Sequence, residues 1–377
     1  VEDTLAGLQR FAAAYLKSLN AKIIGVTGSV GKTSTRDTVY SILKTKYKAG
    51  TAKKNLNSDV GVPLAIFALD PGLEAIVLEL GMDRKGEIHR LANMVRPDVA
   101  IITSSTNIHI ESLKTKEAIL YEKMRITDFM KEENTLVINQ SNDMLAGATF
   151  KGKYGIIKVG LTPDCNYYVH DVVEKGLESV SYILTYEGKD YEVVLNVPGA
   201  HNAINSALSV AACCQLDITV EEAIAGLQDI QLTGARLNLK KVGNINILDD
   251  SYNAGPDSVK SALNTLMGTD GKRHVAILAG MNELGEESDS IHEEVGKFIA
   301  GKNLDLLIVI TRIGKYFSVG YSKACDRPCL YFETKDDFYK AYRENRLLED
   351  GDMVLLKGSR GHALEEVLKF LQEEEEK

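Results

Sequence analysis

The sequence contains no tryptophan, only seven prolines and five cysteines, and no apolar run near the roughly 20 residues that span a bilayer. An odd number of cysteines without regular spacing argues against a disulfide framework and favours a reducing compartment. No signal peptide is visible at the start of the chain. We therefore expect a cytoplasmic protein that is not inserted in a membrane.

An excess of basic residues is also missing, because 44 Lys and Arg face 53 Asp and Glu and the formal net charge is −9. Proteins that bind nucleic acid present a surplus of positive charge to the phosphate backbone. We therefore expect no nucleic-acid partner. Small anionic ligands remain compatible with this composition, since single loops can be positive in an acidic protein.

The first part of the chain alternates short apolar runs with amphipathic stretches. Apolar residues at helical spacing predict a linker helix over residues 1–20, and the runs IIGVTG, AIVLEL and DVAIIT predict buried parallel strands. Residues 181–197 differ, because they alternate in polarity around EGKD and predict an antiparallel hairpin added to the sheet. This pattern indicates an α/β domain with a mostly parallel sheet.

The alternation restarts after residue 232. The apolar runs INILDD, HVAILAG, LDLLIVI, PCLYF and DMVLLKG are separated by helix-like stretches. They predict a smaller, doubly wound unit of Rossmann-like type. We therefore expect two α/β domains, a central P-loop domain over residues 1–232 and a second domain over residues 233–377.

The stretch GVTGSVGKTST, residues 25–35, follows an apolar strand and opens a helix, as a phosphate-binding loop does. Gly28 and Gly31 allow a tight turn, Lys32 supplies a cation, and Thr33 supplies a hydroxyl for magnesium. The strict P-loop pattern would place glycine at position 26, where Val26 stands. The alternative is a glycine-rich turn with an exposed lysine. The predicted phosphate-binding residues are Gly28, Ser29, Gly31, Lys32, Thr33 and Ser34.

Two further residues lie near predicted strand ends, where open α/β sheets bind ligands. Glu79 lies near the end of AIVLEL and could hold magnesium, or it could be a satisfied polar residue at the end of a strand. His109 follows the strand DVAIIT, and taken alone it is more often structural than a ligand.

Several motifs together resemble the Mur ligases. TGSVGKTST, NLNSDVGVPLAIF, VLELGMDRKGEI and RPDVAIIT…HIE are similar to the central ATPase domain of that family. VPGAHNAINSALSVAA, LDDSYNAGPDSVKSAL, MNELGEES…H and LLKGSRG resemble the branch that adds D-alanyl-D-alanine to UDP-N-acetylmuramoyl-tripeptide. The resemblance implies a cytoplasmic bacterial enzyme of peptidoglycan synthesis. ATP would phosphorylate a carboxylate, and an amine would displace the phosphate to form an amide.

The resemblance also implies roles for single residues. Thr33 and Glu79 would hold one magnesium ion, and His109 would help to hold a second. Lys123, in EAILYEKMRI, occupies the place of a lysine that many family members carry as a carbamate, which would add an anionic oxygen ligand. Lys32, Lys123 and His109 are the expected catalytic residues.

Two further sets of residues follow from the same resemblance. The residues expected around the adenine, the ribose and the phosphates of ATP are His201, Asn202, Asn205, Arg236 and Asp250. The residues expected at the muramoyl-peptide and D-alanyl-D-alanine sites are Asn55, Asn57, Tyr252, Asn253, Lys357, Ser359 and Arg360.

The sequence departs from the family pattern at Ser104 and Thr106, at Gly255, and at Gly280 after Ala279. It also opens on a segment resembling the one that follows the family's UDP-sugar domain, so we expect that domain to be missing from this chain. Two alternatives stay open. One is a related ligase for another carboxylate and amine, similar to folylpolyglutamate or cyanophycin synthetases. The other is a nucleotide-binding scaffold without catalysis. We expect a monomer in each case.

Overall fold

The computed structural model describes all residues except 1–2, 53–54, 107–109, 234–236 and 376–377. The chain forms two compact units. The first comprises Val1–Val173 and Val180–Thr233, and the second comprises Glu174–Ser179 and Gly234–Lys377. Both contain a mostly parallel sheet with helices on its two faces, as the alternating apolar runs predict.

The sheet of the first unit has the strand order β2-β3-β1-β4-β5-β6-β7-β8-β9. In this order the neighbouring strands from β2 through β1 to β7 pair in parallel. Strands β8 and β9 form the predicted antiparallel hairpin. The strands are β1 (Lys22–Thr27), β2 (Ala49–Thr51), β3 (Ala75–Glu79), β4 (Val99–Ile102), β5 (Thr135–Asn139), β6 (Gly155–Gly160), β7 (Tyr167–Lys175), β8 (Ser179–Tyr186) and β9 (Lys189–Leu195).

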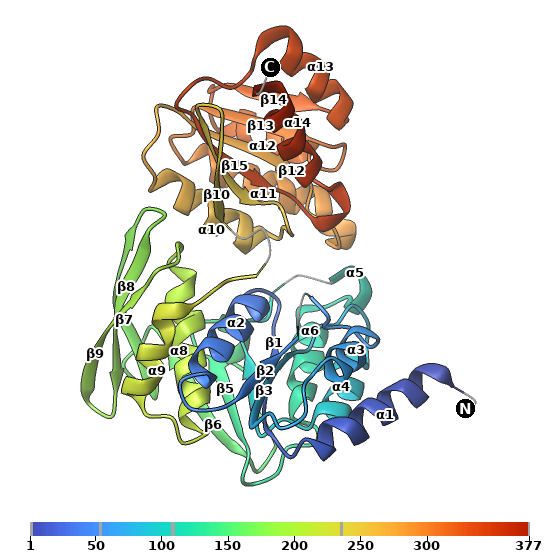
Figure 1. Ribbon diagram of the computed structural model, residues 1–377. Helices are drawn as coiled ribbons and strands as arrows, with labels where there is room; N and C mark the ends of the chain where they lie inside the picture. Colours follow the sequence, from blue (N-terminus) through green and yellow to red (C-terminus); the bar gives the residue numbers. More distant parts are fainter. Residues whose placement is uncertain (1–2, 53–54, 107–109, 234–236, 376–377) are drawn as a thin grey trace. The chain divides into compact units, whose positions relative to one another are not determined.

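Helices cover both faces of this sheet, which explains why its central strands are apolar throughout. On one face α2, α8 and α9 pack on one core, and on the other α1, α3, α4 and α6 pack on a second core (Figure 1). The helices are α1 (Thr4–Ser18), α2 (Lys32–Leu43), α3 (Gly61–Phe67), α4 (Glu87–Val95), α5 (Ile110–Leu113), α6 (Lys116–Met124), α7 (Asp143–Ala146), α8 (His201–Cys214) and α9 (Val220–Gly226).

The second unit has the strand order β10-β11-β15-β12-β13-β14, in which only β10 is antiparallel to its neighbour. All five predicted strands are present, and β10 is an additional edge strand. The strands are β10 (Asn238–Val242), β11 (Ile245–Asp250), β12 (His274–Ala279), β13 (Leu306–Ile310), β14 (Cys329–Phe332) and β15 (Met353–Lys357). The helices are α10 (Pro256–Met267), α11 (Ser288–Ala300), α12 (Lys315–Ala324), α13 (Lys335–Asn345) and α14 (Glu365–Glu375).

Two adjacent strands, β11 and β15, end at Asp250 and Lys357, and β12 lies beside β15. The loops after these three strands therefore share one edge of the second sheet. In the first unit β1 lies between β3 and β4, so the loops after these strands also share an edge. Among the described helices, none has both the length and the apolar character needed to cross a membrane.

Candidate active site

The phosphate loop joins β1 to α2 and depends on two glycines. Gly28 has φ +153°, and a Cβ atom there would lie 1.9 Å from Thr103 Oγ1. Gly31 is the N-cap of α2 with φ +86°, a left-handed conformation that side chains disfavour. The backbone therefore turns sharply before the helix, and the first N–H groups of α2 point out of its N-terminus, where anions bind.

Lys32 is the first residue of α2, and its side chain folds over the loop. Its Nζ donates hydrogen bonds to the carbonyl oxygens of Gly28, at 2.8 Å, and Ser29, at 3.3 Å. The ammonium group is thus held at the open end of the helix, where it adds positive charge to the helix dipole. This arrangement suits the outer phosphates of a nucleotide.

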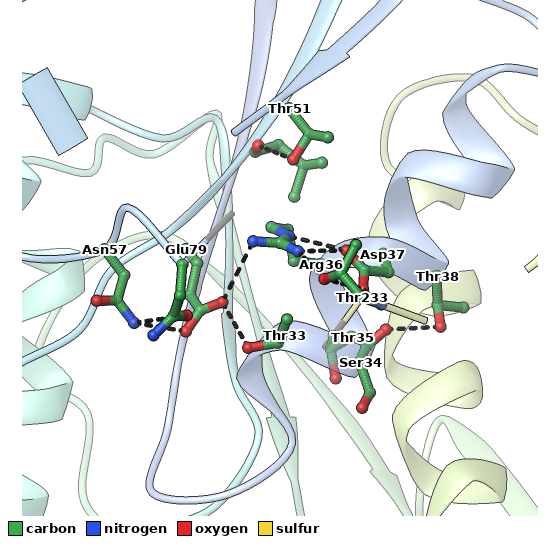
Figure 2. A network of polar contacts seen from close by, with 12 residues as sticks. Thr33, Ser34, Thr35, Arg36, Asp37, Thr38, Thr51, Asn57, Glu79 and Thr233 are labelled. Carbon is green, nitrogen blue, oxygen red and sulfur yellow. Dashed lines mark hydrogen bonds and ion pairs between the residues drawn. The ribbon is translucent and has the colours of Figure 1, made fainter. Parts of the chain in front are cut away.

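Thr33 and Glu79 meet beside the loop, as the sequence motifs predict for a magnesium site (Figure 2). Thr33 Oγ1 donates to Glu79 Oε2 at 2.8 Å, and Asn57 Nδ2 donates to Glu79 Oε1 at 2.8 Å. Glu79 is buried at the end of β3. A hydroxyl and a carboxylate side by side provide the oxygen donors that a hard divalent cation prefers, so the residues fit magnesium.

Asn55 also belongs to this neighbourhood, because Asn57 Nδ2 donates to Asn55 Oδ1 at 3.2 Å. The structure therefore links two residues proposed for substrate with the carboxylate proposed for the metal. In the described part of the chain, no three His, Cys, Asp or Glu side chains gather into a metal site. Any cation beside Glu79 would thus depend on hydroxyl and substrate oxygens as well.

The loop that follows β4 braces the phosphate loop from the side. Ser104 Oγ accepts a hydrogen bond from the backbone N–H of Val30 at 2.9 Å, and the Ser29 N–H donates to the Ser104 carbonyl at 2.9 Å. The Thr106 N–H donates to Ser29 Oγ at 2.9 Å. Two positions at which the sequence departs from the family pattern therefore contact the phosphate loop directly.

Lys123 lies in the last turn of α6 and is fully buried. Burial lowers the pKa of its amine well below the ordinary value, and the positive charge of Lys32 lowers it further, while Glu122 opposes the shift. The neighbouring Glu122 is turned away, since its Oε1 accepts from the backbone N–H groups of Gly86 and Ile88. The environment of Lys123 therefore favours an uncharged, nucleophilic amine.

Helix α8 approaches the phosphate loop from the opposite side. A Cβ atom on Gly31 would lie 2.7 Å from Asn205 Oδ1, which shows how closely Asn205 approaches the loop. Asn202 donates to the Pro198 carbonyl at 2.7 Å, and Asn205 donates to Asn202 at 3.4 Å. His201 is the exposed first residue of α8. The structure thus brings Asn205 to the loop and gives Asn202 a role in the turn that begins the helix.

The second unit has a separate polar cluster at the carboxyl edge of its sheet. Lys357 is buried at the end of β15, and its Nζ forms an ion pair with Asp250 Oδ2 and donates to the Asn253 carbonyl at 3.0 Å. The sequence analysis placed Asp250 with the nucleotide and Lys357 with the substrate. The structure places the two side chains in direct contact.

Ser359 ties three loops of the second unit together. Its Oγ donates to the Ala254 carbonyl at 3.1 Å and accepts from the Asn282 N–H at 2.9 Å, and its own N–H donates to the Gly280 carbonyl at 3.1 Å. A Cβ atom on Gly280 would lie 1.9 Å from Ile313 Cγ2, so this departure from the family pattern fits its surroundings.

Arg360 and Tyr252 lie at the exposed rim of this cluster. The Arg360 guanidinium lies over the Tyr252 ring at 5.9 Å and pairs with Glu365 at 2.8 Å. Gly255 is the N-cap of α10, with Pro256 at the first helical position, where the missing N–H of proline costs nothing. The side chains proposed for substrate in the second unit thus belong to one cluster.

Sequence analysis missed several residues that the structure joins to these sites. In the first unit they are Arg36, Asp37 and Thr233, and Figure 2 shows Arg36 between Glu79 and the other two. Arg36 follows Lys32 by four residues and so shares its helix face, a spacing that could have revealed it. His109 and Arg236, two residues proposed for the site, lie outside the described residues.

The chain is similar to known proteins over nearly its whole length. The family model for the Mur ligase middle domain matches residues 26–213, and the one for the Mur ligase glutamate ligase domain matches residues 235–360. The UDP-N-acetylmuramoyl-tripeptide–D-alanyl-D-alanine ligase of Bacillus subtilis is 33% identical over 374 residues, which cover 98% of this chain and 80% of that protein.

Two solved structures are similar over nearly the whole chain. MurF from Acinetobacter baumannii has a TM-score of 0.91 at 25% identity, and the match covers 99% of this chain and 81% of that one. MurF from Thermotoga maritima, solved in complex with ADP, has a TM-score of 0.86 at 27% identity, with 100% and 85% covered. The chain belongs to the Mur ligase family.

Proposed function

We propose that this protein is an ATP-dependent ligase of peptidoglycan precursor synthesis that joins D-alanyl-D-alanine to UDP-N-acetylmuramoyl-tripeptide. The observation that carries the proposal is the pairing of Thr33 with Glu79 at 2.8 Å, beside a glycine-shaped loop and Lys32. The loop places a nucleotide phosphate, and the pair supplies donors for its metal. The Bacillus subtilis ligase, to which the chain is similar over 98% of its length, supports the choice of substrates.

In this proposal residues 1–232 form the ATP-binding domain and residues 233–377 the C-terminal domain. The γ-phosphate of ATP passes to the terminal carboxylate of the tripeptide, which gives an acyl phosphate and ADP. The amine of the dipeptide then attacks the acyl carbon, and phosphate leaves as the amide forms. Such chemistry needs positioned charges more than a protein nucleophile.

Residues of the first unit hold and orient the phosphates. Gly28, Gly31 and the N-terminus of α2 offer backbone N–H groups, while Lys32 places its ammonium group at the outer phosphates. Thr33 and Glu79 would hold magnesium, which when bound neutralises phosphate charge during transfer. His109 is proposed for a second magnesium ion and Arg236 for the phosphates. Asn202 and Asn205 are proposed to line the nucleotide, with His201 beside them.

Residues of the second unit suit the carboxylate of the dipeptide. Lys357, Ser359 and Arg360 place cationic and hydroxyl groups at one sheet edge, with Tyr252 and Asn253 beside them. Asp250 pairs with Lys357 and so fixes its ammonium group. Asn55 and Asn57 of the first unit are proposed for the muramoyl-peptide because they adjoin Glu79.

Lys123 is proposed to be carbamylated. Its uncharged amine would attack carbon dioxide, forming an N–C bond and releasing one proton, so that a neutral amine is replaced by an anion with two oxygen donors. Labelling with ¹³C-bicarbonate followed by NMR would detect this carbamate. We expect the signal in the unchanged protein and in the control Lys131→Arg, which alters an exposed lysine. Lys123→Arg should lose the signal and about 100-fold in turnover, because an electrostatic stabiliser is removed.

The proposed activity is tested by measuring ADP release with the muramoyl-tripeptide while the amine is varied. We expect release to require both the tripeptide and D-alanyl-D-alanine. Thr33→Ala should reduce it at least 100-fold, whereas Thr45→Ala, just beyond the same helix, should leave it unchanged. Turnover with an amino acid in place of the dipeptide would support the related ligases instead. Nucleotide binding without any turnover would indicate a scaffold.

A cytoplasmic location is part of the proposal, because all five cysteines are free thiols. The partners proposed are the two small-molecule substrates and ATP, and the protein is proposed to act as a monomer. Size-exclusion chromatography with light scattering would measure the oligomeric state, and a dimer would contradict that part.

A further inference from the structure

Two charged side chains of α2, which the proposed chemistry does not use, are almost completely buried. Arg36 is 1% exposed and Asp37 is 5% exposed. Both lie in the helix that begins with Lys32 and Thr33, one turn beyond these residues. Charged side chains are seldom buried without a specific pairing, so the partners of these two residues show what they do.

Arg36 contacts two carboxylates and a hydroxyl (Figure 2). Its Nε donates to Asp37 Oδ1 at 2.9 Å, and one terminal nitrogen donates to Asp37 Oδ1 and to Thr233 Oγ1, the latter at 2.6 Å. The other terminal nitrogen lies 3.7 Å from Glu79 Oε2, the oxygen that also accepts from Thr33. One guanidinium group thus joins the carboxylate proposed for the metal to Thr233.

Asp37 completes the arrangement with its second oxygen. Its Oδ2 accepts from the backbone N–H of Thr233 at 2.7 Å and from Thr233 Oγ1 at 2.8 Å. The Thr233 hydroxyl therefore donates to Asp37 and accepts from Arg36. This closed set of bonds uses the amide and the side chain of Thr233 together, so it fixes the residue in both position and orientation.

Thr233 is the residue at which the first unit ends along the chain. It lies 197 residues from Arg36 in the sequence, and nothing in local helix geometry requires the two to meet. A buried ion pair contributes little to stability when compared with apolar residues of similar size. It offsets the cost of desolvating its charges only when the two side chains are held in one well-defined geometry. The arrangement therefore suits a positioning role better than a purely stabilising one.

We infer that Arg36 and Asp37 are positioning residues that anchor the end of the first unit, at Thr233, to the phosphate-loop helix and couple this anchor to Glu79. The inference rests on the proposed function in one respect, since it takes Glu79 as part of the magnesium–nucleotide site. A change of charge at Glu79 changes the electrostatic force on the Arg36 guanidinium, which lies 3.7 Å away. Any shift of that guanidinium alters its hydrogen bond to the hydroxyl of Thr233. Neither Arg36 nor Asp37 touches the reacting atoms in this scheme.

Hydrogen exchange of the Thr233 amide gives a readout that does not depend on turnover. This amide donates to Asp37 Oδ2, so we expect it to be protected in the unchanged protein and to exchange at least 10-fold faster in Asp37→Asn. Adding magnesium and ADP should change its exchange at least threefold in the unchanged protein. The same addition should have no effect in Arg36→Lys, because a compact ammonium group lacks the planar fork whose separate nitrogens reach Asp37, Thr233 and Glu79.

Kinetics provide the second readout. Thr233→Val removes the hydroxyl and keeps the shape, and we expect kcat to fall about 10-fold while the ADP dissociation constant stays within twofold. Thr233→Ser should restore kcat because it restores the hydroxyl. The matched control is Thr38→Val, which removes a buried hydroxyl whose hydrogen bond, to the Ser34 carbonyl, lies within α2, and it should leave kcat unchanged.

The outcomes separate this inference from the proposed function. If Thr233→Val matches Thr38→Val in kcat, and Asp37→Asn leaves the Thr233 amide protected, the anchor is wrong even though the unchanged protein is an active ligase. If the unchanged protein shows no ligase activity, the proposed function fails, while exchange of the Thr233 amide still tests the anchor. If Thr233→Val does not fold, Thr233→Ser and Arg36→Lys decide by the same two readouts.

Discussion

The two units place the groups proposed for function at the same kind of position, the carboxyl edge of a parallel sheet. They differ in whether the backbone or the side chains give the site its shape. In the first unit the backbone shapes the phosphate loop, through Gly28, Gly31 and the start of α2. In the second unit side chains form it, through the contact of Lys357 with Asp250 and the bonds of Ser359. The first site should therefore be sensitive to added volume and the second to removed charge.

The largest effect is expected from Gly28→Ala, which adds one methyl group to the backbone site. The new Cβ atom would lie 1.9 Å from Thr103 Oγ1 and 3.1 Å from the Ser104 backbone nitrogen, so the loop must move. We expect ADP release to fall at least 100-fold and the free energy of unfolding to fall by about 1–3 kcal/mol. Kinetic assays and chemical denaturation measure the two effects.

Gly188→Ala is the matched control for that substitution. Gly188 lies in the turn between β8 and β9 with φ +75°, and a Cβ atom there has no neighbour within 4 Å. The strain of a left-handed alanine should lower the free energy of unfolding by about 1–2 kcal/mol without changing turnover. If both variants lost turnover equally, backbone strain rather than the shape of the phosphate loop would explain the loss.

A smaller effect is expected from Lys357→Met, which removes charge from the side-chain site and keeps its volume. Asp250 would lose its buried partner, and we expect the free energy of unfolding to fall by about 2–4 kcal/mol. The apparent Michaelis constant for the dipeptide should rise at least 10-fold. An equal rise for ATP would assign the pair to the nucleotide instead.

The double variant Asp250→Asn with Lys357→Met provides the check on this interpretation. With both charges gone, most of the lost stability should return, because no unpaired charge stays in the cluster. Dipeptide binding should stay weak. If the double variant were as unstable as Lys357→Met, lost packing rather than an unpaired carboxylate would be the cause.

The same contrast explains which features the sequence could predict. The phosphate loop was predictable because its residues are consecutive, and the continuous apolar runs predicted β1, β3, β4 and all the parallel strands of the second unit. Strands β2, β5, β6 and β7 were not predicted, and β10 was also missed. Strand β7 lies toward the edge of its sheet and β10 lies at the edge of its own. Both mix polar with apolar residues, so they lack the continuous apolar signal.

Contacts between distant residues could not be predicted in the same way. The bonds from Arg36 and Asp37 to Thr233 join positions almost 200 residues apart, and charged residues on a helix are ordinarily solvated. Likewise, Ser104 was predicted only as a departure from a pattern, whereas the structure shows that it accepts from the Val30 amide. Such contacts depend on which loops the sheet order brings together, and local sequence patterns do not reveal that order.

The smallest effect is expected from a substitution of His292, whose ring bonds to the backbone of the loop after β12. It is fully buried, its Nδ1–H donates to the Ser288 carbonyl at 2.7 Å, and its Nε2 accepts from the Met281 N–H at 2.8 Å. Both bonds require the neutral ring. Burial lowers the pKa of His292 below 6.5; the Ser288 carbonyl and then Asp289 raise it by less, and His362 adds the smallest effect, which lowers it.

The direction of the pH dependence follows from this lowered pKa. Between the folded pKa and 6.5 the unfolded chain binds a proton at His292 that the folded protein does not, so stability is full above pH 6.5 and falls as the pH is lowered. One such proton changes the free energy of unfolding by at most about 1.4 kcal/mol per pH unit. His292→Gln keeps an oxygen that can accept from Met281, and it should flatten the curve of stability below about pH 6.5, the unperturbed pKa of histidine.

His362 contributes with the same sign, because burial and then Lys335 lower its pKa, so His292→Gln should remove only part of the slope and His362→Gln another part. Denaturation at several pH values measures both. Because His292 fixes the backbone of the loop that Ser359 also holds, loss of the ring should affect the dipeptide more than ATP. An unchanged slope in His292→Gln would mean that other groups cause the acid sensitivity, and that the second site does not depend on a neutral histidine in the way its geometry indicates.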